Sequence, residues 1–178
     1  MKKFLMTLVA AFGLAVSANA QTYVGGGFSI FGQDNGNTTV TTYKFIPEIG
    51  YNFNKDWAAG VAFGWEGANK GNEKSIEVNP YARYTFLHTK FVNVFVDGGF
   101  GYTHYNHAHD FGTPSVNEWS VGLKPGVAVN LNQKLSFVAH VGFAGWKSEK
   151  YDGASKDSHV WGVSLDGNNV NFGVYYNF

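Results

Sequence analysis

From residue 21 onward, apolar residues take every second place in eight successive stretches that polar breaks separate. A period of two indicates a β-strand with one apolar and one polar face, because successive side chains point to opposite sides. The last stretch, residues 170–178, shows the pattern without interruption, and its apolar positions are Val170, Phe172, Val174, Tyr176 and Phe178. The chain beyond residue 21 is therefore predicted to be all-β.

Charged residues within these stretches fall on the face opposite to the apolar one. They are Lys44, Glu48, Glu66, Glu77, Arg83, Asp97, Glu118 and Lys124. A charge that faces lipid near the bilayer midplane costs roughly 2–4 kcal/mol, so a membrane barrel must segregate its charges in this way. We expect an eight-stranded antiparallel up-and-down transmembrane β-barrel. A soluble barrel or sandwich with its apolar face inward would show the same alternation, so alternation alone leaves both open.

Aromatic residues gather at the two ends of the predicted strands. One group comprises Tyr51, Phe53, Trp57, Tyr84, Phe86, Phe91, Tyr176 and Phe178, and the other Phe31, Tyr43, Trp65, Tyr102, Trp119 and Trp161. Two aromatic belts that bracket an aliphatic band are typical of membrane barrels. The alternative is that these side chains form the aromatic core of a soluble β-sandwich.

The N-terminal segment predicts a secretory signal peptide. Lys2 and Lys3 precede an apolar run over residues 4–16, and a small-residue cleavage pattern follows at residues 18–20. The run is shorter than the roughly 20 residues that a transmembrane helix needs. We expect cleavage between Ala20 and Gln21, which divides the chain into a signal peptide, 1–20, and a barrel domain, 21–178.

Charge and cysteine content exclude several functions. Without Lys2 and Lys3, the 13 Lys and Arg become 11 against 13 Asp and Glu, a net charge of −2 with neutral His. This charge gives no case for nucleic acid binding. The chain has no cysteine, which excludes disulfides, thiol catalysis and thiolate metal sites.

The connections between the predicted strands alternate in length. Residues 52–56, 87–90 and 131–134 are short, whereas residues 32–38, 67–74, 104–115 and 147–158 are longer. Membrane barrels have short periplasmic turns and longer external loops, so we expect both ends of the barrel in the periplasm. Asp166–Asn169 would add a strand if it were a hairpin turn. We expect a bulge there within one long eighth strand, because a bulge shifts the alternation by one residue.

The predicted interior alternates small and large residues. The small interior residues include Gly60, Gly99, Gly122 and Gly126, and the large ones are Tyr81, Arg83, Phe95 and Trp146. Phe143 is expected on the opposite face, toward lipid. Side chains fill an eight-stranded barrel, so this alternation indicates packing and no open pore.

Counting residues from the short turns predicts an interior charge network of Lys44, Glu48, Arg83, Asp97, Lys124 and His140. We expect an Asp97–Lys124 ion pair with His140 nearby, and we expect Arg83 to reach toward Glu48. Buried charges must be paired, so the simpler interpretation is a structural polar core. The alternative is a gate whose ion pairs exchange partners to admit water or ions.

The sequence offers two further candidate chemistries outside this network, a metal site and a serine hydrolase. His104, His107, His109 and Asp110 lie in a long loop, and His159 lies near another, but their spacing matches no defined metal site. A serine hydrolase needs Ser, His and an acid in one geometry, and no partner pattern accompanies Ser120, Ser136 or Ser164. No catalysis, metal or cofactor is therefore predicted.

Three segments carry a resemblance to a known family: residues 45–51 (FIPEIGY), residues 78–84 (VNPYARY) and residues 170–178 with their Asn-Phe ending. Together with the signal peptide and the eight stretches, they resemble the small OmpX/OmpA-type outer-membrane β-barrel family, the outer membrane protein beta-barrel domain proteins. The resemblance implies a location in the outer membrane of Gram-negative bacteria.

The resemblance also implies partners and a range of roles. Outer-membrane lipid and lipopolysaccharide would surround a monomeric barrel. The barrel-assembly machinery would recognise an insertion signal formed by Phe172, Val174, Tyr176 and Phe178. We expect a structural or surface-interaction role. A small or gated porin-like channel is the alternative, and a lipid A-modifying enzyme is a further one.

Overall fold

The computed structural model describes residues 21–34, 39–68, 73–107, 115–152, 157–165 and 170–178. The predicted signal peptide and its cleavage site at Ala20 lie outside these residues on the N-terminal side. None of the described residues forms a helix long and apolar enough to cross a membrane. The strands are β1 (Thr22–Asp34), β2 (Thr39–Asn52), β3 (Trp57–Ala68), β4 (Glu73–His88), β5 (Val92–His107), β6 (Val116–Asn130), β7 (Leu135–Val141), β8 (Phe143–Tyr151), β9 (Ser158–Ser164) and β10 (Val170–Asn177).

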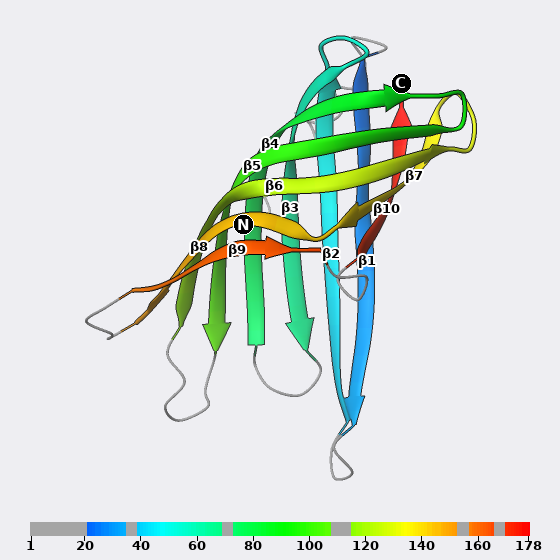
Figure 1. The fold of residues 1–178 in the computed structure, drawn as a ribbon. Coiled ribbons are helices and arrows are strands. Elements are labelled where there is room, and N and C mark those ends of the chain that lie inside the picture. The colour runs from blue at the N-terminus through cyan, green and yellow to red at the C-terminus, as the bar shows by residue number, and fades with distance from the viewer. Residues whose placement is uncertain (1–20, 35–38, 69–72, 108–114, 153–156, 166–169) are drawn as a thin grey trace, which may run out of the picture.

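These segments form a closed, eight-stranded antiparallel barrel, as the sequence predicted (Figure 1). Each of β1 to β6 pairs with the next strand along the chain, and β6 then pairs with both β7 and β8. β7 and β8 are consecutive parts of one wall strand, because both lie antiparallel along the same edge of β6. The ring closes where β10 pairs with β1.

A single glycine separates β7 from β8 and shifts the alternation of side chains. Gly126 pairs with His140, but Leu123 pairs with Ala144, so β8 carries one residue more than its partner strand. Gly142 lies at this bulge with φ +74°, a conformation that glycine adopts without steric cost. The predicted directions of two side chains are therefore wrong: Phe143 lines the interior, and Trp146 lies on the outer face beside Val121.

The eighth wall strand consists of β9 and β10. β9 is antiparallel to β8 and β10 is antiparallel to β7, so both run in the same direction along the wall. The predicted bulge at Asp166–Asn169 lies outside the described residues, between these two segments. Since the chain direction is the same before and after it, the eight-strand count holds.

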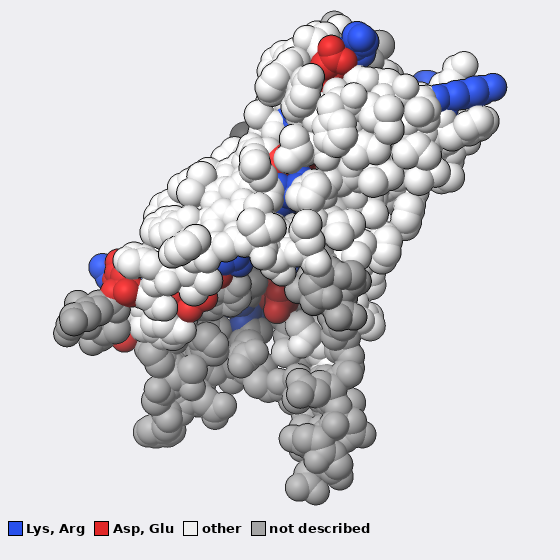
Figure 2. Space-filling model, viewed as in Figure 1, with Lys and Arg blue, Asp and Glu red and all other residues white. Residues whose placement is uncertain are grey.

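Apolar and charged residues occupy opposite faces of the wall, as a bilayer requires. Phe28 and Val121 on the outer face are 64% and 52% exposed, whereas Phe95 and Val138 inside are almost fully buried. Charged Arg83, like other polar residues of the interior, is buried as well. The structure thus excludes the arrangement of a soluble barrel, and Figure 2 shows a broad outer surface with few charged residues.

The three short turns lie where the sequence predicted them. β2 ends at Asn52 and β3 begins at Trp57, and the other two turns follow β4 and β6. Side-chain oxygens hold these turns: the Oδ1 atoms of Asn54 and Asn132 and the Oγ1 atom of Thr89 accept hydrogen bonds from backbone N–H groups two or three residues ahead. Asn, Asp and Thr favour turns for this reason.

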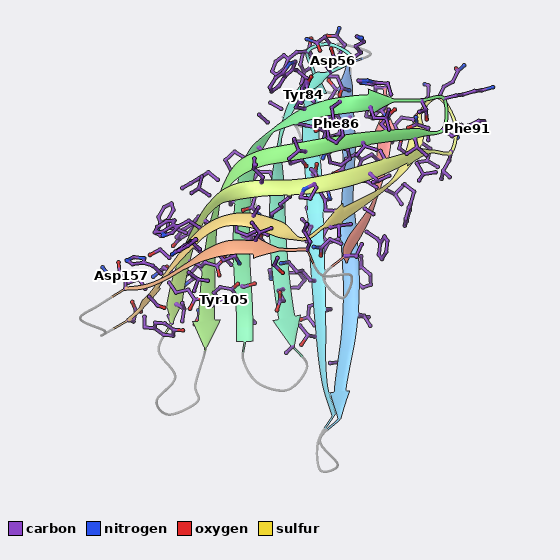
Figure 3. The ribbon with its side chains drawn as sticks, viewed as in Figure 1. Asp56, Tyr84, Phe86, Phe91, Tyr105 and Asp157 are labelled. Carbon is purple, nitrogen blue, oxygen red and sulfur yellow. The ribbon has the colours of Figure 1, made fainter. Side chains whose placement is uncertain are left out.

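One aromatic belt and both ends of the described barrel lie at the same end as these turns. Tyr84, Phe86 and Phe91 are seen there in Figure 3. The Trp57 and Tyr84 rings lie 4.8 Å apart, and the Tyr176 and Phe178 rings lie 4.9 Å apart. The backbone N–H of Phe178 donates to the carbonyl of Thr22, which brings the start of β1 next to the end of β10.

Candidate functional site

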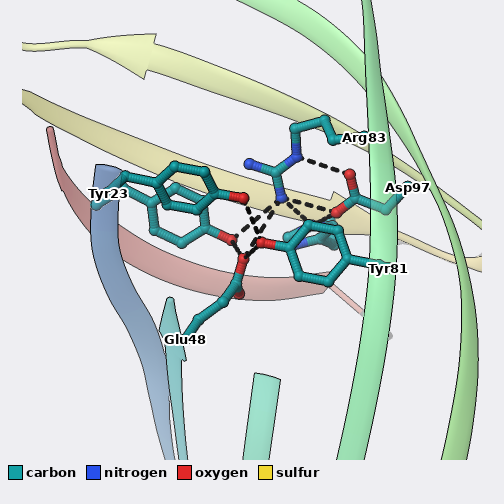
Figure 4. A network of polar contacts seen from close by, with 7 residues as sticks. Tyr23, Glu48, Tyr81, Arg83 and Asp97 are labelled. Atoms are coloured by element: carbon teal, nitrogen blue, oxygen red, sulfur yellow. Dashed lines mark hydrogen bonds and ion pairs between the residues drawn. The ribbon is translucent and has the colours of Figure 1, made fainter. Parts of the chain in front are cut away.

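A cluster of charged and phenolic side chains fills the interior in the half nearer the short turns (Figure 4). Its centre is Arg83 on β4, which is paired in register with Asp97 on β5. Arg83 Nε and Nη2 donate to Asp97 Oδ1 and Oδ2 at 2.6 and 2.7 Å. Two parallel, charge-assisted hydrogen bonds of this kind fix the guanidinium in one plane.

Glu48 on β2 is the second carboxylate of the cluster. Its Oε1 lies 3.7 Å from Arg83 Nη2 and accepts hydrogen bonds from the hydroxyls of Tyr81 and Tyr175, the latter at 2.6 Å. Counting residues from the turns predicts that Arg83 reaches toward Glu48, and the structure places the two side chains in contact. Because Glu48 is buried, these hydroxyls replace the water that would otherwise solvate its charge.

The predicted ion pair between Asp97 and Lys124 is wrong. Asp97 and Lys124 are register partners on β5 and β6, but Asp97 is engaged by Arg83 on its other side. The second hydrogen-bond partner of Asp97 is His140. Its Nε2 atom lies 2.8 Å from Asp97 Oδ2 and 3.5 Å from Arg83 Nη2. His140 thus lies near Asp97 as expected. Over the described ranges, Lys124 forms no ion pair with an acidic side chain.

Aromatic rings enclose the Arg83 guanidinium. Its Cζ lies 3.9 Å from the centroid of Phe95, and the rings of Tyr23 and Tyr175 stack on one another at 5.4 Å. A cation over an aromatic face is stabilised by the quadrupole of the ring. Gly126 leaves the space that Phe95 occupies, since a Cβ atom there would lie 2.4 Å from the ring.

A second group of charges lies farther from the short turns. Lys44 Nζ is 2.8 Å from Glu77 Oε2 and 3.9 Å from Glu66 Oε2. Lys147 Nζ is 3.1 Å from Glu118 Oε1. These side chains are more exposed than the Arg83 cluster, so the interior opens toward the longer connections.

A cavity of about 120 Å³ lies between the two groups. A water molecule needs roughly 10–15 Å³ measured in this way, so several fit. Its wall combines charged Glu77 and Lys124 with apolar Ile46 and Phe143. Figure 2 shows basic and acidic atoms in a recess at the middle of the uncharged face.

Several of the candidate histidines and serines have hydrogen-bond partners among the described residues. His104 Nδ1 lies 2.8 Å from Asn117 Oδ1. The side chains of His107, His109 and Asp110 lie outside the described part of the chain. Within the described ranges, no group of three or more His, Cys, Asp or Glu residues is placed to hold a metal ion. Ser136 Oγ donates to Asn130, and the hydrogen-bond partners of the His140 ring among described residues are Asp97 and Arg83.

Sequence reasoning missed Tyr23 and Tyr175 as members of the cluster. Both lie on the inward face of their strands, and the sequence argument used only the alternating apolar residues of the outward face. A tyrosine at an inward position next to a buried acid is the sequence feature that points to this role, since its hydroxyl can solvate the acid.

Comparison with known proteins gives one family and several structures. Residues 4–178 match the family described as outer membrane protein beta-barrel domain. The fold is similar to that of Neisserial surface protein A (TM-score 0.58, 13% identity, 88% of this chain and 97% of that chain covered). It is also similar to the N-terminal β-barrel domain of Pseudomonas aeruginosa OprF (TM-score 0.55, 13% identity, 90% and 98% covered). No curated protein matches the chain.

Proposed function

Since this chain belongs to the outer membrane protein beta-barrel domain family, we propose that it acts in the outer membrane as a non-conducting, non-catalytic barrel with a structural or surface-interaction role. The observation that carries this proposal is the Arg83 cluster. It fills the interior with buried, mutually bonded side chains from β1, β2, β4, β5, β7 and β10. Ions would have to break these contacts to pass.

The proposed orientation places the short turns in the periplasm. The longer connections then face the exterior, where a barrel presents its surface to other molecules. The lipid-facing wall is proposed to contact outer-membrane lipid and, in the outer leaflet, lipopolysaccharide. Phe172, Val174 and Tyr176 line the lipid face of β10 and with Phe178 are the proposed insertion signal for the barrel-assembly machinery. A monomer is proposed, since the ring closes within one chain.

Conductance in a planar lipid bilayer tests the proposal. We expect no current steps from the wild-type protein at either polarity, and none from Lys134→Ala, a control in an exposed turn. Arg83→Ala removes the central cation and is expected to admit small ions or to destabilise the barrel. Wild-type current steps that disappear when Asp97 or His140 is substituted would overturn the proposal in favour of a gated pore.

A further inference from the structure

Each of the three short turns carries one lysine: Lys55 between β2 and β3, Lys90 between β4 and β5, and Lys134 between β6 and β7. All three side chains are exposed. Asp56 is the one acidic side chain within these turns, and its Oδ1 lies 3.8 Å from Lys55 Nζ. Lys90 and Lys134 form no ion pair with an acidic side chain in the described part of the chain. This end of the barrel therefore presents two lysines without acidic partners.

Lys90 and Lys134 lie on neighbouring turns of the barrel rim. The backbone N–H of Asn130 at the end of β6 donates to the carbonyl of Phe91 at 2.7 Å, which joins the turn of Lys90 to the start of the turn of Lys134. The backbone N–H of Asn177 on β10 donates to the carbonyl of Lys134 at 2.7 Å. The two lysines thus belong to one continuous stretch of rim, and Figure 2 shows basic side chains projecting from this end of the molecule.

Both ammonium groups lie over exposed aromatic rings of the belt. Lys90 Nζ is 5.5 Å from the centroid of the Phe91 ring, and Lys134 Nζ is 5.7 Å from the centroid of the Tyr176 ring. Phe91 is 64% exposed, and Tyr176 lies on the outer face of β10. A cation over such a ring is stabilised by the quadrupole of the ring. Lys134 is therefore held on the lipid side of the wall, and Lys90 at the exposed edge of the adjacent turn.

The level of these side chains in a bilayer indicates what they contact. Tyrosine rings of an aromatic belt lie among the lipid head groups, and lysines near the ends of membrane segments extend their ammonium groups to the same level. Leu131 in the same stretch is 60% exposed and adds an apolar side chain beside the Phe91 ring. A soluble acidic partner would have to displace head groups to reach this position. The molecules that surround the two ammonium groups are thus lipids.

We propose that Lys90, Phe91, Leu131, Lys134 and Tyr176 form a rim patch that selects anionic glycerophospholipids, with phosphatidylglycerol as the simplest. The two ammonium groups donate hydrogen bonds to phosphate oxygens, and the acyl chains extend along the exposed apolar side chains of the patch. A zwitterionic lipid offers the same phosphate but carries its own cation, which weakens its attraction to the lysines. The assignment of this lipid to the periplasmic leaflet rests on the orientation given under the proposed function.

Quenching of tryptophan fluorescence by brominated lipids tests the proposal on the full barrel in vesicles. A protein whose only tryptophan comes from Phe91→Trp reports on lipid at the rim patch and keeps an aromatic ring beside Lys90. Brominated phosphatidylglycerol and brominated phosphatidylcholine, compared in mixtures of the two lipids, give the relative binding constant at this position. We expect phosphatidylglycerol to bind at least about fivefold more tightly, since each lysine near a lipid surface contributes about that factor. High salt should reduce the preference.

The chain offers matched controls for this measurement. Lys90→Gln combined with Lys134→Gln should abolish the preference, whereas Lys55→Gln should keep it, because Asp56 already accompanies Lys55. A protein whose only tryptophan is Trp57 reports on the belt next to the turn of Lys55 and should show no comparable preference. Heat-modifiable migration in gels verifies that each variant is folded.

Several outcomes would overturn the proposal. Equal binding of the two lipids, or a preference that survives the double replacement, would show that the rim patch does not select a head group. A preference that Lys55→Gln weakens as strongly as the double replacement would reduce it to the net charge of the barrel. Loss of the preference on adding inorganic phosphate at constant ionic strength would assign the lysines to a soluble anion.

Failure of the proposed function gives a different result. A conducting barrel, or short turns that react with a label applied outside intact cells, would overturn the proposed role or orientation. Neither result changes the lipid preference measured in vesicles whose two leaflets have the same composition. The two failures are therefore distinguishable.

Discussion

Arg83 and Asp97 face one another as register partners on β4 and β5, joined by two hydrogen bonds of 2.6 and 2.7 Å inside the barrel. Both side chains are buried, and each also contacts a further ionisable group. Removing one charge leaves the other without its counterion in a place that water reaches poorly. Replacing only one of the two charged side chains should therefore destabilise the barrel more than the second replacement does once the first is made.

Arg83→Met should lower the free energy of unfolding by about 3–5 kcal/mol, because it leaves Asp97 as an uncompensated buried charge. Urea unfolding in phospholipid vesicles, followed by tryptophan fluorescence, measures the change. Arg83→Met combined with Asp97→Leu should cost less than the sum of the single substitutions. Lys55→Ala breaks an exposed pair with Asp56 and should change stability by less than about 1 kcal/mol. Additive effects of Arg83→Met and Asp97→Leu would contradict the coupling.

Tyr175→Phe should destabilise the barrel by about 1.5–3 kcal/mol, because the Tyr175 hydroxyl donates to the buried carboxylate of Glu48. The chain provides a matched control in Tyr151, whose hydroxyl donates to Glu149 on an exposed surface at 3.0 Å. Tyr151→Phe should leave the urea midpoint within error of the wild type. Equal midpoints for Tyr175→Phe and Tyr151→Phe would show that Glu48 does not need the Tyr175 hydroxyl.

Gly142→Ala should destabilise the barrel by about 1–3 kcal/mol, because a side chain at φ +74° is strained. The new Cβ atom would also lie 2.1 Å from the carbonyl oxygen of Ser164, so the bulge must shift. Gly162→Ala on β9 is the control, since a Cβ atom there meets nothing within 4 Å. Thermal unfolding monitored by gel migration compares the two variants. Indistinguishable unfolding temperatures would exclude a special role for Gly142.

Fluorescence quenching should show which way β8 faces. In a protein whose only tryptophan is Trp146, brominated lipid chains should quench the emission strongly, because this side chain lies on the outer face next to Val121. A variant with Phe143→Trp as its only tryptophan should be quenched much less, since residue 143 lines the interior cavity. The reverse order of quenching would mean that β8 continues the alternation of β7 without a bulge.

The alternation in the sequence predicted the eight strands, the three short turns and the segregation of charge correctly. It succeeded because a strand in a bilayer must keep its charges on one face along its whole length. The alternation did not reveal the bulge at Gly142, because Val141 and Phe143 on either side of it are both apolar. A shift of one residue there exchanges one apolar side chain for another. The shift becomes visible at Lys147, which has the parity of Val141 but pairs with Glu118 inside the barrel, and residue 147 falls in a connection that the sequence predicted to be a loop.

The sequence also could not choose the partner of Asp97. Arg83, Asp97 and Lys124 lie in one row across β4, β5 and β6, so counting from the turns places both cations at the same depth as the acid. The structure selects Arg83, whose planar guanidinium binds both carboxylate oxygens at once. A lysine ammonium lacks this fork geometry. Only the three-dimensional arrangement reveals that Lys124 instead faces a cavity.

The seam between β1 and β10 has a mechanical consequence. It joins five residue pairs, Tyr23 to Gly27 with Gly173 to Asn177, and the ends of both strands lie side by side. A force that pulls Thr22 and Phe178 apart acts across these hydrogen bonds, so they break one after another instead of sharing the load. In a single-molecule pulling experiment, the barrel should therefore rupture first at this seam and at low force, before any of the longer strand pairs yields.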